Sequence, residues 1–232
     1  ADDIFVTMKV DPVEVRVGLK LTPLVNDAAG LFIERVAAFR KQYAGESGFV
    51  VPAVRFRDER TLDDEAYEIR IHGSTVASGR IVPGQTLAIH PGGELKALPG
   101  RETRDPTYGL PAYWIDPTLH DEARAARFTL VDPGTVLLTH LNEVLRQQSA
   151  SLLTRSETGA LIDRLRQTQA SLVDELIPSV LTLSEVQKVL QNLLREKVSI
   201  LNLEMVLEVL VDAGRSVKDA QQLTELVRQK LA

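Results

Sequence analysis

The sequence of 232 residues contains no cysteine, which excludes a disulfide framework and any metal site built from thiolates. It also lacks a run of about 18 or more apolar residues, the minimum for a helix that spans a membrane. The first residues, ADDIFVTMKV, have neither the basic flank nor the apolar core of a secretion signal. We therefore expect a cytosolic polypeptide and, because it begins with alanine, a fragment or a processed product.

An excess of positive charge is also missing. The chain has 32 acidic and 27 basic residues, so no overall positive field draws it to nucleic acid. A sheet that binds RNA needs exposed aromatic residues, yet only Tyr67 is aromatic among the strand candidates AYEIRI, TVASGRI and TLAIHP. We expect other proteins, and no nucleic acid, as partners.

The motifs of common active sites are absent too. There is no GxxxxGK[ST] loop, no GxGxxG and no GxSxG, which removes the usual geometry for nucleotide binding and acyl transfer. The four histidines lack the spacing of a metal motif; they are His72, His90, His120 and His140. Paired acids at 2–3, 63–64 and 121–122 resemble solvated turns or first-turn acids of helices. We expect no enzyme activity, no metal and no cofactor.

The first half of the chain mixes strand and helix patterns. Residues 13–21, VEVRVGLKL, alternate apolar and polar side chains, as a half-buried strand does. After Asn26 and Asp27, which can cap a helix, the apolar spacing predicts an amphipathic helix that ends near Gly45. The apolar stripe of this helix is Leu31, Val36, Phe39 and Tyr43. The extended segments VPAVRF, AYEIRI, TVASGRI and TLAIHP follow, with a hairpin at Gly73.

A long connection rich in glycine and proline, residues 90–111, predicts a boundary between subdomains. After it, the strand candidates 112–115 and 128–131 are expected to return to the first sheet. Residues 59–106 would then be an insertion into a first subdomain formed by 1–58 and 107–131. The loop TYGLPAYWI carries the chain's only tryptophan, Trp114, to this junction. Its aromatic residues either plug a hinge or form the wall of a groove for a partner.

From residue 132 onward the sequence predicts an all-helical subdomain, 132–232. Asp132 and Pro133 form a favourable helix start. The capping-box pattern, Ser or Thr followed three residues later by Glu, occurs at Thr154 and again at Thr182. The predicted helices span 133–149, 156–169, 171–177, 183–195, 200–212 and 219–230.

The leucine-rich stretch VLQNLLREKVSILNLEMVLEVL, residues 189–210, is explained by the core of this bundle. Its spacing places two apolar stripes on neighbouring helices: Val186, Val189, Leu190, Leu193 and Leu194 on the first, and Leu203, Val206, Leu207 and Leu210 on the second. Each fully buried Leu or Val contributes about 1.5 to 3 kcal/mol. The stretch therefore predicts a fold and no function.

Seven segments in order resemble the cytosolic domain of the bacterial type III export gate family (FlhA/LcrD), which serves the flagellum and the injectisome. They are FVVPAVRFRDE, YEIRIHGSTVASGRI, LAIHPGGE, DPTYGLPAYWID, VDPGTVLLTHLNEVL, LIDRLRQTQASLVDELIP and VLQNLLREKVSI. The forms GLPAYWI, THL and VLQNLL resemble the flagellar branch. The resemblance implies an α+β fold, in which a mixed α/β first subdomain is interrupted by a small ferredoxin-like β-α subdomain and followed by an all-α helical one. A fourth subdomain of the family is expected beyond Ala232.

The resemblance also implies a function without catalysis: a docking platform for flagellar protein export, at the cytoplasmic face of the bacterial inner membrane. In the family, a membrane region precedes the cytosolic part, which forms a ninefold ring. The implied partners are export chaperones with their substrates and other export apparatus proteins. The implied docking dimple is formed by Ile81, Val82, Pro83, Tyr108 and Leu110. The implied ring contact uses Arg155, Glu157, Arg164, Arg195, Glu196 and Lys197. The alternatives are the export gate of a virulence injectisome and a purely structural ring module.

Three departures from the family's sequence pattern affect this expectation. The chain has RDE at 57–59 where relatives commonly have RDN, and TRSE at 154–157 where they have GRQE. At 199–202 it has SILN in place of SIRN or SIRD. Leu201 matters most, because an arginine there could reach a neighbouring carboxylate and a leucine cannot. We therefore expect a ring contact that is weaker or differently built.

Overall fold

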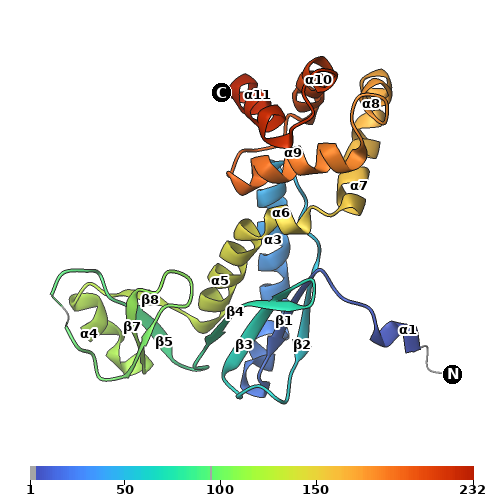
Figure 1. Cartoon of the computed structure of the whole chain (residues 1–232). Coiled ribbons are helices and arrows are strands. Elements are labelled where there is room, and N and C mark those ends of the chain that lie inside the picture. The colour runs from blue at the N-terminus through green and yellow to red at the C-terminus, as the bar shows by residue number, and fades with distance from the viewer. Residues whose placement is uncertain (1–3, 95) are drawn as a thin grey trace. The chain divides into compact units, whose positions relative to one another are not determined.

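The computed structural model describes residues 4–94 and 96–232. They form two compact units: the first takes in the chain up to Ala38 and Ala53–Val144, and the second Phe39–Pro52 and Leu145–Ala232. Figure 1 shows the elements in chain order by colour. The predicted fold class, α+β with an all-helical C-terminal half, is confirmed: in the described part of the chain, every strand belongs to the first unit.

The first sheet has the strand order β2-β1-β3-β4. Its strands are β1 (Val13–Val17), β2 (Val54–Asp58), β3 (Ala66–Ile71) and β4 (Ser74–Arg80). β2 runs parallel to β1, and the other neighbours are antiparallel. The predicted hairpin turn joins β3 to β4 and needs glycine, because Gly73 has a φ of 83°. A short helix before the sheet, α1 (Ile4–Thr7), buries none of its residues.

The strand predicted over 13–21 is too long, because β1 ends at Val17. The 3-10 helix η1 (Leu19–Leu21) and the short helix α2 (Thr22–Val25) take up the remaining apolar residues. At Gly18, whose N–H donates to the Ala66 carbonyl at 2.8 Å, a Cβ atom would collide with the backbone of residues 63–64. The strand therefore ends where Gly18 packs against residues 63–64, although apolar and polar residues continue to alternate beyond it in the sequence.

The predicted helix after Asp27 is α3 (Leu31–Ser47). The Asp27 carboxylate accepts the backbone N–H of Leu31 at 3.0 Å and that of Phe32 at 3.3 Å, as a capping residue does. The predicted stripe is wrong at its first position, because Leu31 is 57% exposed and Phe32 is buried in its place. Val36, Phe39 and Tyr43 are buried as predicted. Residues 31–38 of this helix belong to the first unit and the rest to the second.

The second sheet has the order β6-β7-β5-β8, with all neighbours antiparallel. Its strands are β5 (Thr86–Ile89), β6 (Arg101–Arg104), β7 (Pro111–Ile115) and β8 (Thr129–Val131). Between β7 and β8 lie the 3-10 helix η2 (Pro117–Leu119) and the helix α4 (His120–Ala125). One face of the sheet and α4 share a small core of Ala88, Leu98, Ile115, Ala123 and Phe128.

The expected return of residues 112–115 and 128–131 to the first sheet is therefore wrong. Both segments pair with β5 in the second sheet, as β7 and β8. The segment 59–106, predicted to be an insertion, contributes β3 and β4 to the first sheet and β5 and β6 to the second. The predicted boundaries of the insertion therefore do not separate the strands of the first sheet from those of the second.

The C-terminal part is helical, as predicted, and residues 133–232 contain no strand. Its helices are α5 (Pro133–Gln147), α6 (Ser149–Leu152), α7 (Arg155–Arg166), α8 (Ala170–Leu176), α9 (Leu183–Arg195), α10 (Leu203–Gly214) and α11 (Ala220–Leu231). Only the single turn of α6 was not predicted as a separate helix, because four residues are too few for a periodic pattern. Up to Val144, α5 belongs to the first unit.

The predicted caps fix the starts of these helices. The Asp132 carboxylate accepts the backbone N–H of Thr135 at 3.1 Å. At Thr182 both bonds of the capping box are present. The Thr182 hydroxyl accepts the Glu185 N–H at 3.1 Å, and the Thr182 N–H donates to the Glu185 carboxylate at 2.9 Å. Thr154 makes the first of the two bonds, accepting the Glu157 N–H at 3.2 Å.

The two predicted apolar stripes lie in the core of the second unit. All five members on α9 are buried, and so are Val206, Leu207 and Leu210 on α10, whereas Leu203 is half-buried. Polar bonds support this core: the Gln191 amide donates to the carbonyls of Ala150 and Leu153, both at 3.1 Å. The leucine-rich stretch is thus interior packing, as predicted.

Candidate docking surface

The loop between β6 and β7 is built around a buried carboxylate. Asp105 is 5% exposed. Its side chain accepts the backbone N–H groups of Thr107 at 3.2 Å, Tyr108 at 2.8 Å and Leu110 at 2.6 Å. The Asp105 N–H donates to the Leu110 carbonyl at 2.8 Å, and the Gly109 N–H donates to the Asp105 carbonyl at 2.9 Å. These five bonds hold residues 105–110 in one conformation.

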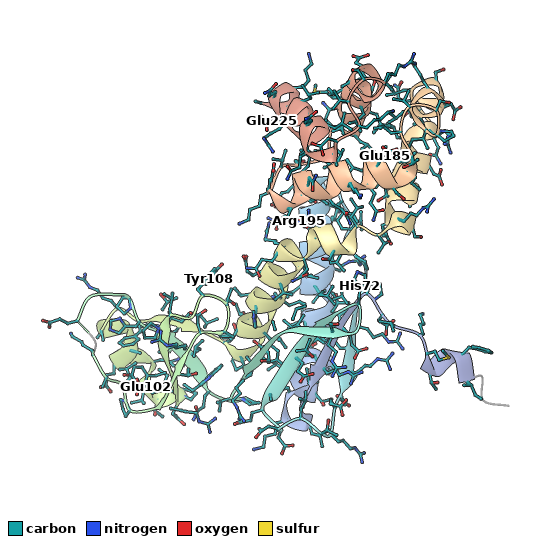
Figure 2. The ribbon with its side chains drawn as sticks, in the orientation of Figure 1. His72, Glu102, Tyr108, Glu185, Arg195 and Glu225 are labelled. Atoms are coloured by element: carbon teal, nitrogen blue, oxygen red, sulfur yellow. The ribbon has the colours of Figure 1, made fainter. Side chains whose placement is uncertain are left out.

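This rigid loop exposes two large apolar side chains. Tyr108 is 66% exposed and Leu110 is 46% exposed. Figure 2 shows the Tyr108 side chain projecting from the loop. Because the backbone of the loop is already ordered, and an aromatic side chain has few rotatable bonds, covering Tyr108 by a partner costs little conformational entropy. The pair has the properties of an anchor for another protein.

The other three residues of the predicted dimple are less accessible. Ile81 is fully buried, Val82 is 8% exposed, and Pro83 is half-buried. The Ile81 N–H donates to the Glu65 carbonyl at 2.9 Å, which ties this segment to the backbone before β3. Ile81 and Val82 therefore contribute interior packing, and direct contact with a partner stays a prediction for Pro83, Tyr108 and Leu110.

A buried polar pair lies within reach of the Asp105 charge. The Tyr67 hydroxyl on β3 lies 2.5 Å from Nδ1 of His140 on α5. Burial raises the pKa of Tyr67, and the Asp105 carboxylate raises this pKa further. Tyr67 therefore stays protonated and donates to Nδ1, which requires His140 to be the neutral Nε2–H tautomer. Burial lowers the pKa of His140, and the Asp105 charge opposes this shift.

This pair has a structural role, because both side chains are buried: Tyr67 has no exposed surface and His140 is 7% exposed. Gly79, the cross-strand partner of Tyr67 on β4, makes room for it, since a Cβ atom at position 79 would overlap the Tyr67 hydroxyl. Electrostatics thus connect the β6–β7 loop with β3 and α5. Sequence reasoning missed Asp105, Tyr67 and Gly79. The only local signal was the Asp-Pro-Thr-Tyr-Gly pattern, which is typical of a turn whose Asp side chain bonds the following N–H groups.

The residues predicted for a ring contact divide into two groups. Arg155 and Arg164 are exposed and Glu157 is half-buried, all on α7. The exposed side chains of Arg195, Glu196 and Lys197 lie at the end of α9 or just beyond it. Among the described residues, no hydrogen bond or ion pair joins the first group to the second.

Two members of the second group, Arg195 and Glu196, line a groove of about 430 Å³ between α9 and α11. Arg228 on α11 donates two hydrogen bonds of 2.8 Å to the Glu196 carboxylate and also pairs with Glu225. Figure 2 labels Arg195 and Glu225 on these two helices. Arg228 was missed because the sequence does not reveal which helix faces α9. These charges are exposed, so their pairs contribute little to stability.

Residues 4–94 and 96–232 contain neither a metal-binding cluster nor a membrane-spanning helix. In this part of the chain, no group of three or more His, Asp or Glu side chains could hold a metal ion. None of its helices combines the length and the apolar composition needed to cross a membrane.

Comparisons with known proteins identify the family of this chain. The model of the FHIPEP family matches residues 2–232. The flagellar biosynthesis protein FlhA of Bacillus subtilis is 40% identical over 226 residues, which cover 97% of this chain and 33% of that protein. FlhA of Salmonella typhimurium is 40% identical over 222 residues, covering 95% and 32% respectively. The chain thus spans about a third of the length of the curated relatives it matches.

Solved structures share the fold at lower identity. The Chlamydia pneumoniae CdsV protein matches with a TM-score of 0.78 and 23% identity, over 98% of this chain and 67% of that one. The nonameric EPEC SctV-C matches with a TM-score of 0.68 and 19% identity, over 94% of this chain and 64% of that one. The resemblance identified in the sequence is confirmed, and the chain belongs to the FHIPEP family.

Proposed function

We propose that the chain is the cytosolic docking part of a type III export gate that serves flagellar protein export. Support comes from the family match over residues 2–232 and from 40% identity to proteins named for flagellar biosynthesis. The proposed place of action is the cytoplasmic face of the bacterial inner membrane. The function requires binding and no catalysis.

The observation that carries the docking role is the exposed pair on the β6–β7 loop. Tyr108 and Leu110 are exposed, while the carboxylate beneath them bonds the loop in place. A partner that covers this pair gains the burial of an aromatic and an aliphatic side chain, the type of contact that dominates binding energy at interfaces. The proposed partners are export chaperones loaded with their substrates, and other proteins of the export apparatus.

Assembly into a ring is the second element of the proposal. EPEC SctV-C, which shares the fold of this chain, is nonameric in its solved structure. In this chain the exposed charges of α7 and α9 are the candidates for contact between copies. Arg228 joins them, because it already bonds Glu196. A ring would position many copies of the docking loop side by side, which raises the effective local concentration of docking sites.

The docking role is tested by charge substitution at the exposed loop. Tyr108→Asp leaves the interior untouched, whereas a charge at Val82 would enter the core and unfold the protein. We expect Tyr108→Asp to weaken binding of a flagellar chaperone–substrate complex by about 30-fold, the loss of one interface hot spot. Isothermal titration measures the affinity. Export of flagellar subunits by cells with the substitution in the intact protein gives the functional result.

The matched control is Val76→Asp on β4, because Val76 is 41% exposed and lies outside the loop. This variant should bind and export normally. Unchanged binding and export by Tyr108→Asp would eliminate the docking role and leave the purely structural ring module as the better account.

The alternative, an export gate of a virulence injectisome, has weaker support. The relatives that match at about 40% identity are named for flagellar biosynthesis. Complementation decides between them: the intact protein should restore swimming to a flagellar export-gate deletion and should not restore injectisome secretion.

A further inference from the structure

β2 is an edge strand with an open side. In the first sheet it pairs only with β1, in an unbroken parallel register from Val54 to Asp58. The opposite edge, β4, is interrupted by a register shift between Ile69 and Arg70 of its partner strand. A bulge of this kind twists an edge away from further pairing. β2 is therefore the regular edge of this sheet.

A groove of about 340 Å³ follows this open edge. All five residues of β2 line one wall. The other wall is formed by Thr22, Val25 and Asn26 from α2 and its end, and by Ile33 from the first turns of α3. A groove between a strand edge and a helix is the arrangement in which an extended peptide adds to a sheet as a further strand.

The backbone of β2 is oriented to accept such a strand. The Glu59 N–H, just after β2, donates to the Val17 carbonyl at 2.9 Å and so faces β1. Alternate residues of a strand direct their backbone groups to opposite sides. Val54, Phe56 and Asp58 therefore direct theirs away from β1, into the groove.

One face of the edge favours apolar side chains. Phe56 contacts Phe32 of α3 edge to face, with ring centroids 5.4 Å apart. The Asp58 carboxylate accepts the Thr22 hydroxyl at 2.7 Å on this same side. Ile33, also in the wall, is 48% exposed. A strand added to β2 would place alternate side chains against Phe56 and Ile33.

Among the described residues, the opposite face presents one arginine without an acidic partner next to the edge. Arg57 pairs with Asp11 at 3.0 Å and Glu14 at 3.3 Å, whereas Arg55 is exposed and has no carboxylate partner among the described residues. In an added strand, the side chains that alternate with the apolar ones would point to this opposite face and lie close to the Arg55 guanidinium. Charge complementarity there favours Glu or Asp.

We propose that β2 binds an extended segment of a partner protein in which apolar and acidic residues alternate, and that this segment becomes a fifth strand of the first sheet. The strand edge supplies main-chain hydrogen bonds, Ile33 and Phe56 contact the apolar residues, and Arg55 selects the acidic ones. This surface is separate from the Tyr108 loop, and its test does not depend on the docking role proposed above.

The test uses the 232-residue chain and three fluorescein-labelled peptides. The probe is acetyl-VEVEVEV-amide. The controls are VKVKVKV, which reverses the charge, and VEVPVEV, whose proline removes an N–H donor and interrupts a strand. We expect binding of the probe, at least about tenfold weaker binding of both controls, and slower amide exchange at Phe56 and Asp58 when the probe is bound.

Two variants locate the binding to β2. Arg55→Glu should weaken binding of the probe by about five- to tenfold, since a repulsive charge contact replaces an attractive one. Asp58→Pro should abolish binding, because it removes an N–H that faces the groove and leaves the pairing with β1 intact. Its matched control, Asp58→Ala, keeps the N–H and should bind at least as well as the wild type.

Several results would overturn the proposal. These are equal binding of the glutamate and lysine peptides, no change in amide exchange over 54–58, or full binding by Arg55→Glu. One more contradicting result could come from sedimentation and amide exchange of the chain without peptide. If the chain forms a dimer in which the same amides are protected, the edge binds a second copy of the chain. If Asp58→Pro fails to fold, the peptide series, Arg55→Glu and amide exchange still decide the matter.

Discussion

Replacing Asp105 tests whether the buried carboxylate holds the candidate docking loop. Its side chain accepts three backbone N–H bonds of 2.6 to 3.2 Å. A hydrogen bond to a charged group contributes about 1.5 to 3 kcal/mol, but amides released near the surface regain bonds to water. We therefore expect Asp105→Ala to lower the free energy of unfolding by about 2 to 4 kcal/mol. Asp105→Asn, which keeps one acceptor oxygen, should cost about half as much.

Urea denaturation measures this loss, with one probe in the first unit and one that follows helices throughout the chain. The fluorescence of Trp114, on β7 beside the loop, follows the first unit. Far-UV circular dichroism is dominated by the helices, and coincident transitions would justify a two-state treatment. A loss below about 0.5 kcal/mol for Asp105→Ala would refute the reasoning, because three bonds to a buried carboxylate cannot be replaced at so small a cost. If the loop is held as described, chaperone binding should weaken for Asp105→Ala even where the variant is fully folded.

Three further predictions concern the interior. Leu190→Ala in the core of the second unit should cost about 2 to 5 kcal/mol in urea denaturation, and a loss under 1 kcal/mol would contradict its burial. Gly79→Ala should cost about 2 to 4 kcal/mol, because the methyl group displaces Tyr67 and breaks its hydrogen bond; tyrosine absorbance would show its exposure. Burial lowers the pKa of His140 from the ordinary 6.5, so the unfolded state takes up a proton first, and stability should fall as the pH drops through about 6.5 and below. His140→Gln should flatten that part of the pH dependence of unfolding, and an unchanged slope would exclude this group as its source.

Features encoded by neighbouring residues were predictable from the sequence. The boundaries of α9 and its capping box follow from Thr182, Glu185 and the spacing of Val186 to Leu194, and the structure has them as predicted. The same holds for the buried stripes of the bundle. These signals depend on contacts within one or two helical turns, which a sequence displays directly.

Features that depend on partner choice were not predictable. The strands β7 and β8 have the same local pattern whichever sheet they join, so their pairing with β5 could not be deduced. Leu31 and Phe32 differ by one position, and only the packing of Phe32 against Phe56 decides which of them is buried. The candidate docking loop was identified through Tyr108 and Leu110. Its buried support at Asp105 was not, because an aspartate next to proline is usually taken as a surface turn.

The way the bundle helices begin has a consequence for local opening of the second unit. α7, α9, α10 and α11 each start at a residue whose side chain accepts a backbone N–H from the first turn of the helix; these residues are Thr154, Thr182, Asn202 and Asp219 respectively. α6 and α8 both start without such a bond, but three of the four residues of α6 are buried, whereas only two of the seven residues of α8 are. Fraying of the second unit should therefore begin at α8, so that a protease acting on the native protein would cut this unit first near residue 169 while the neighbouring helices remain closed.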